Sequence, residues 1–176
     1  MDSDETNPWP EIDRLDAAST GNGSGPRDAI AAARRALAPV QRSLAEAGFY
    51  AYGTVDDANR WTIAADDEAG RIDVRVGDDG FDVELWASSP GLYADDENEF
   101  RRRARERLAR ITLPNIARGF LQTHQSASWD EVDHGIAVRL HYQLPFTRGD
   151  DIGQFVRQRL PELEKLLTFV ESQVTS

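Results

Sequence analysis

Apolar side chains recur every three or four residues after Pro26, which is the spacing of one face of an amphipathic helix. Because proline fits the first position of a helix, we expect this helix to begin at Pro26, to kink at Pro39 and to end at Gly48. The residues of its apolar face are Ile30, Ala33, Leu37, Val40, Leu44 and Ala47.

The same spacing predicts two further helices. One is expected to begin near Asp95, to bury an apolar stripe and to be interrupted at Pro114. The other is expected over residues 149–174, with a break or kink at Pro161. The stripe of the middle helix contains Phe100, Ala104, Leu108 and Ile111. The seam of the last helix contains Val156, Leu160, Leu163, Leu167, Val170 and Val174.

Between these helices, apolar and polar residues alternate, as in strands with one buried and one exposed face. Ile72, Val74 and Val76, for example, alternate with charged residues. Polar turns separate the first four strands, and Asp133-His134-Gly135 separates the last two. The expected strands span residues 49–55, 60–66, 71–77, 81–87, 126–132 and 136–144.

The elements therefore follow the order α-β-β-β-β-α-β-β-α. Three main helices grouped around an antiparallel sheet predict an α+β protein. Residues 1–25 have the acidic, Gly- and Ser-rich composition of a solvated, disordered tail. Residues 26–176 are expected to form a single domain, which suits a chain of 176 residues.

The charge balance indicates an unusual environment. The chain has a formal net charge of −11, Lys165 is its only Lys, and 19 of its 31 acidic residues are Asp. Such a surface suits multimolar salt, in which charge repulsion is screened while arginine still pairs with carboxylates. We therefore expect a protein of a halophile's cytoplasm. The acidic start and the short apolar runs predict neither a secretory signal nor a membrane span.

The residues that could carry catalysis are few. The chain has no Cys, which excludes disulfides, thiolate metal ligands and cysteine nucleophiles. A small metal-dependent hydrolase built on His134, His141 and nearby carboxylates is an alternative, although their seven-residue spacing is not that of a helical zinc pair. We expect no enzyme activity, no cofactor and no resident metal.

Six arginines between residues 101 and 110 are compatible with a nucleic-acid-binding helix. However, Glu97, Glu99 and Glu106 each precede an arginine by four residues and are expected to pair with part of this charge. Aromatic residues for base stacking are not interleaved with the arginines. Nucleic-acid binding is therefore a minor alternative, and docking of an acidic partner segment is favoured over it.

The apolar stripes either fill the core of one copy or form an interface in part. We expect part of them to pair with a second copy or with another polypeptide. Trp86 lies on the otherwise polar face of its strand, where a large aromatic side chain suits an interface. The candidate interface residues are Trp61, Trp86, Leu160, Leu163, Leu167 and Val170.

The order of elements, the segment Leu113-Pro114-Asn115-Ile116 and the stretch from Tyr142 to Phe146 carry a resemblance. In these features the chain is similar to the YbjN-type proteins, which share the fold of the type III secretion chaperones. The resemblance implies a homodimeric α+β module without catalytic residues, with a chaperone-like or regulatory role. We therefore expect a non-enzymatic, dimeric protein-binding module.

Overall fold

The computed structural model describes residues 25–176 of the chain. The predicted tail, residues 1–25, lies outside the described residues except for Gly25. The elements are α2 (Pro26–Glu46), β1 (Tyr50–Val55), β2 (Trp61–Asp67), β3 (Gly70–Val76), β4 (Phe81–Ser89), α3 (Glu99–Phe120), β5 (Gln125–Asp130), β6 (Gly135–Leu144), the 3₁₀ helix η1 (Phe146–Asp151) and α4 (Ile152–Thr175). Their order confirms the predicted α+β class.

The six strands form one antiparallel sheet in the order β1-β2-β3-β4-β6-β5. Short turns connect β1 to β4 as a meander, and β6 then pairs with the free side of β4 after the chain has passed through α3. Val74 pairs with Val83, and Leu85 pairs with Leu140, so the apolar residues of neighbouring strands share one face. The alternation seen in the sequence thus gives the sheet one apolar face.

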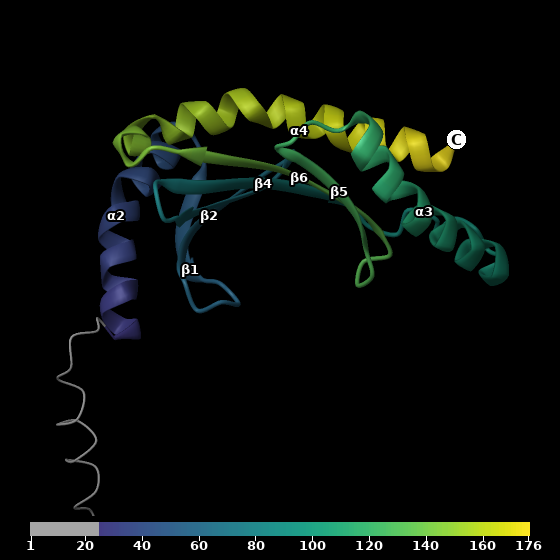
Figure 1. The fold of residues 1–176 in the computed structure, drawn as a ribbon, viewed down its shortest axis with the longest axis horizontal. Coiled ribbons are helices and arrows are strands. Elements are labelled where there is room, and N and C mark those ends of the chain that lie inside the picture. The colour runs from purple at the N-terminus through teal and green to yellow at the C-terminus, as the bar shows by residue number, and fades with distance from the viewer. Residues whose placement is uncertain (1–24) are drawn as a thin grey trace, which may run out of the picture.

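Two helices cover this apolar face (Figure 1). α2 packs against β1, β2 and β3, whereas α4 runs along β3, β4 and β6. α3 lies beside the edge strand β5 and against α4, at the opposite end of the sheet from α2. The largest fully buried side chains include Leu37, Leu44, Ile63, Ile72, Leu85, Leu113, Leu140, Ile152 and Leu163.

The prolines do not break the helices in which they lie. The sequence predicts an interruption at Pro114 and a break or kink at Pro161, yet α3 and α4 each continue through their proline. A proline removes one backbone hydrogen bond, but Leu113, Leu160 and Leu163 are buried beside these positions and hold the adjoining turns. Tertiary packing therefore outweighs the local preference, and the predicted interruption is wrong.

The junction of α2 and α4 requires a close backbone approach. The Ser43 hydroxyl donates a hydrogen bond to the Asp150 carbonyl at 2.8 Å and accepts one from the Gly153 N–H at 2.9 Å. A Cβ atom at residue 153 would overlap the Ser43 carbonyl oxygen. Glycine at residue 153 is therefore a requirement of this contact.

Gly153→Ala is expected to lower the free energy of unfolding by about 1–3 kcal/mol, because α4 must move away from α2 to relieve the overlap. Gly119→Ala is the matched control, since a Cβ atom there meets nothing within 4 Å. That control is expected to be neutral or stabilising by up to about 1 kcal/mol. Urea denaturation in molar KCl measures both, and equal effects would contradict the assigned contact.

Candidate interaction surface

The outer side of α3 exposes a continuous apolar stripe. Phe100 is 86% exposed, Leu108 62% and Ile111 61%, and Ala104 between them is also exposed. We call these four residues the α3 stripe. The sequence predicts that they are buried, and this prediction is wrong. The residues that α3 buries are Glu106, Ala109, Leu113 and Ile116.

Local contacts fix the orientation of α3. The Asn98 side chain caps the helix by accepting a hydrogen bond from the Arg101 N–H at 3.0 Å. Further along, Arg110 donates two hydrogen bonds of 2.6 Å to the carboxylate of Glu131 in the β5–β6 turn. The Arg110 guanidinium also lies over the ring of Trp129. The inner side of α3 is thus held against β5, and the α3 stripe faces outward.

The arginines of α3 divide between two sides of the helix. Arg103 and Arg107 precede Arg110 by seven and three residues, so they lie on the side of the β5–β6 turn. Arg103 pairs with Glu99 and Arg110 approaches Glu106, as the spacing predicts. Arg101 and Arg105 lie on the other side.

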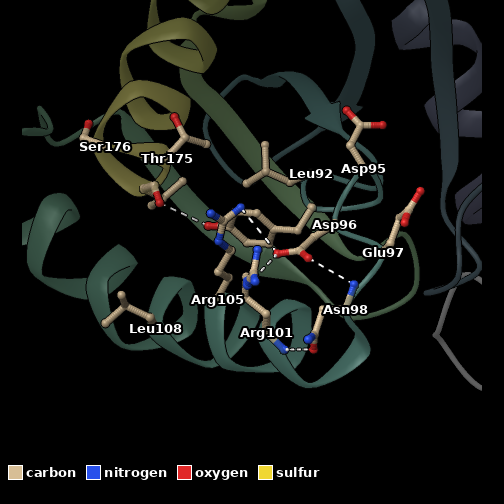
Figure 2. Close-up of a pocket in the computed structure, with 12 residues that line it drawn as sticks. Leu92, Asp95, Asp96, Glu97, Asn98, Arg101, Arg105, Leu108, Thr175 and Ser176 are labelled. Carbon is tan, nitrogen blue, oxygen red and sulfur yellow. Dashed lines mark hydrogen bonds and ion pairs between the residues drawn. The ribbon is translucent and has the colours of Figure 1, made fainter.

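Arg101 and Arg105 line a cleft of about 800 Å³ (Figure 2). The cleft lies between residues 92–98, the first turns of α3 and the end of α4. Leu92, Leu108 and Val174 supply its apolar lining. One residue of the α3 stripe, Leu108, therefore also borders this cleft.

Tyr93 joins the walls of the cleft. Its hydroxyl donates a hydrogen bond to the Val174 carbonyl at 3.1 Å, which attaches the end of α4 to the segment before α3. Burial raises the pKa of Tyr93, and the nearby positive charge of Arg105 opposes this only in part. The hydroxyl is therefore protonated at neutral pH and remains a donor.

Asp96 forms ion pairs with both arginines but accepts no hydrogen bond from either of them. One of its carboxylate oxygens accepts a hydrogen bond from the Asn98 N–H at 3.1 Å. The other is buried and lies 3.9 Å from Arg101 Nε and 3.7 Å from Arg105 Nη1, beyond hydrogen-bond distance. Within residues 25–176, the side chains of Arg101 and Arg105 donate no hydrogen bond to a protein group. The N–H groups of both side chains are therefore able to bind a ligand in the cleft, and each guanidinium group also forms an ion pair of 3.7–3.9 Å with Asp96.

His134 and His141 lie in different surroundings. His134 is in the β5–β6 turn, where its Nδ1 is 3.5 Å from Glu106 Oε1. His141 lies on the open face of the sheet, with its Nε2 4.0 Å from Asp82 Oδ1. Seven residues of strand separate the two by about 24 Å. Among residues 25–176, no group of three His, Cys, Asp or Glu side chains is arranged to hold a metal ion.

The apolar seam of the last helix belongs mainly to the core. Leu160, Leu163 and Val170 are buried on the inner side of α4 within a single copy. Leu167 and Trp61 are half-buried and pack against the same core. Burial within one copy argues against an interface at Leu160, Leu163 and Val170, whereas the interface expected at Leu167 and Trp61 stays a prediction.

Trp86 has a polar role on the open face of the sheet. Its indole Nε1 donates a hydrogen bond of 3.0 Å to the carboxylate of Asp73, which also accepts one from Arg71. The exposed flank of the ring lies near Arg139. Trp86 is therefore anchored within its own sheet and is half-buried without any partner.

Sequence reasoning missed a polar cluster that joins α4 to β5 and β6. Glu162 accepts hydrogen bonds from His124 at 2.5 Å, from Tyr142 at 3.0 Å and from Gln125 at 3.1 Å. Burial, followed by the hydrogen bond to Glu162, raises the pKa of Tyr142 to about 12. His124 and Gln125 are neighbours at the start of β5, whereas Tyr142 is in β6 and Glu162 is in α4, so no local sequence spacing connects the cluster.

The chain matches no protein-family model, no curated protein and no solved structure. The resemblance to the YbjN-type proteins thus remains an expectation from the sequence. None of the helices in the described part of the chain is long and apolar enough to cross a membrane.

The Glu162 cluster predicts a pH-dependent contribution to stability. Burial raises the pKa of Glu162, but its hydrogen bonds outweigh burial and hold the pKa below the ordinary value. The stabilisation is therefore present above the ordinary glutamate pKa of about 4.3 and is lost as the pH falls through the lower folded-state pKa. Glu162→Gln should cost about 1 kcal/mol at neutral pH and less as the pH falls below about 4.

Urea denaturation of Glu162→Gln between neutral and acidic pH measures this effect. Glu164→Gln is the matched control, because Glu164 is an exposed neighbour on the same helix. A cost for Glu162→Gln that is constant with pH, or equal to that of the control, would contradict the role assigned to the cluster.

Proposed function

We propose that this chain is a non-enzymatic protein-binding module that forms a homodimer through the α3 stripe. The observation that carries the proposal is the exposure of Phe100, Leu108 and Ile111 along one side of a well-anchored helix. Contiguous apolar surface of this kind is typical of protein interfaces. The module has a chaperone-like or regulatory role, which the resemblance of its element order to the YbjN-type proteins supports.

The spacing of the α3 stripe suits a second copy. Its members are separated by four, four and three residues, which reads almost the same in both directions. Antiparallel pairing about a two-fold axis brings Phe100 opposite Ile111 and Ala104 opposite Leu108. Each central contact then joins a large side chain to a small one, which favours close helix packing.

Leu108→Asp is expected to convert the dimer into a folded monomer, because the interface would then bury two unpaired carboxylates, one in each contact between residue 108 and Ala104 of the other copy. Tyr50→Asp is the control, since Tyr50 is 82% exposed on β1 and distant from α3. Size-exclusion chromatography with light scattering in molar KCl should give twice the 19.6 kDa chain mass for wild type and control. A wild-type monomer, or a dimeric Leu108→Asp variant, would refute the proposal.

We further propose that the module works in the salt-rich cytoplasm of a halophile. The support is the net charge of −11, together with cationic side chains that are almost all arginine. Many of these arginines are in ion pairs with Asp or Glu, among them Arg60 with Asp56 and Arg139 with Glu84.

Stability is expected to rise with KCl from dilute buffer into the molar range, because screening relieves repulsion among the acidic residues. Thermal melting followed by circular dichroism across a KCl series measures this. Urea, which is uncharged, should give no stabilisation at any concentration and serves as the solute control. A melting temperature that falls steadily as KCl is added would be incompatible with salt adaptation.

A further inference from the structure

The cleft beside α3 combines an apolar lining with two arginines whose donors are not used within the described residues. Leu92, Leu108 and Val174 supply apolar parts of its lining. Arg101 and Arg105 lie between Leu92 and Leu108 in the view of Figure 2. The Asp96 carboxylate lies behind the two guanidinium groups at 3.7–3.9 Å. A ligand for this cleft therefore needs a negative group next to an apolar one.

The shape of the positive groups favours a carboxylate. A guanidinium group presents two parallel N–H donors that match the two oxygens of a carboxylate, and contact of this kind persists where long-range attraction is screened. Two arginines one helical turn apart can hold one carboxylate between them or two neighbouring ones. Asp96 offsets one of the two arginine charges, and with Asp95 and Glu97 the charged side chains of the lining sum to −1, so the cleft suits a single carboxylate placed on the guanidinium groups and not a polyanion.

The rim of the cleft also disfavours nucleic acid. Asp95 and Glu97 border the opening and point away from the arginines. They would repel any continuous run of negative charge, whether a phosphate backbone or consecutive acidic residues, because such a ligand cannot keep its charges away from the rim. A polypeptide with acidic and apolar residues close together satisfies both the arginines and the apolar walls.

We propose that this cleft binds an acidic, leucine-rich segment of a partner protein, with a partner carboxylate on Arg101 and Arg105 and an apolar side chain against Leu92 and Val174. This inference rests on the proposed function, since it names the class of partner. It does not require the dimer, because Phe100 and Ile111 of the α3 stripe do not line the cleft.

Fluorescence anisotropy tests the proposal with a fluorescein-labelled peptide of repeated Glu-Leu-Ser units, titrated with the full chain in KCl. The peptide is expected to bind saturably. The double variant Arg101→Gln/Arg105→Gln should weaken binding about tenfold or more, because charge-assisted hydrogen bonds are lost. The matched control, Arg103→Gln/Arg107→Gln, removes the same charge from the other side of α3 and should change the affinity less than about twofold.

Three further measurements separate the possible occupants. A peptide of Gln-Leu-Ser units should bind about tenfold more weakly than the acidic one, since it lacks the carboxylates. Phe100→Asp should bind the acidic peptide even as a monomer, so failure of the dimer proposal and failure of this one are distinguishable. A labelled single-stranded DNA should show no binding that depends on Arg101 and Arg105.

The proposal is overturned if the acidic peptide does not bind, or if both double variants weaken binding equally. It is also overturned if the Gln-containing peptide binds as well as the acidic one, or if DNA binds in an Arg101- and Arg105-dependent manner. Circular dichroism of each variant in the same KCl buffer establishes that a loss of binding is not a loss of folding.

Discussion

The structure depends on one constraint, which is that its sheet has a single apolar face and that α2 and α4 are sufficient to cover it. Covering this face buries the apolar sides of both helices, as Leu44 and Leu163 illustrate. α3 then needs only a narrow inner side to stay beside β5 and α4. Its other apolar residues have no place within one copy, and each costs free energy in water in proportion to its exposed apolar area. The contact with another chain that is proposed above would remove this cost.

The sheet could be predicted from the sequence because the alternation of apolar and polar residues indicates both that a segment is a strand and which of its side chains lie on the buried face. Val74 and Val83 each alternate with charged neighbours, and both lie on the buried face. The middle helix could be predicted as a helix but not in its orientation. It carries two apolar stripes on nearly opposite sides, one through Leu108 and one through Leu113, and periodicity does not tell which side the sheet will cover. That choice is made mainly by the burial of Ala109, Leu113 and Ile116 where α3 packs against β5 and α4, and the Arg110–Glu131 pair adds a link between residues 21 positions apart.

The candidate site was harder to predict, for the same reason. The α4 seam has the spacing of an interface, but the sheet buries Leu160 and Leu163, and only the three-dimensional arrangement shows that it does so. The cluster around Glu162 brings together residues from β5, β6 and α4. The cleft needs the end of α4 beside the start of α3, which no local pattern encodes. What the sequence did contain was the arginine-rich composition of this helix, on which the proposed preference for an acidic partner rests.

The two proposed contacts of α3 suit the salt in which the chain is proposed to work. At molar ionic strength the Debye length is about 3 Å, so charges act only between groups in contact. Long-range attraction to a polyanion is weak under these conditions, whereas a guanidinium group touching a carboxylate keeps much of its interaction. Burial of apolar surface does not depend on charge and is not screened. An apolar stripe for one partner and an arginine-carboxylate contact within an apolar cleft for another are therefore interactions that an acidic, salt-adapted protein can use without losing specificity.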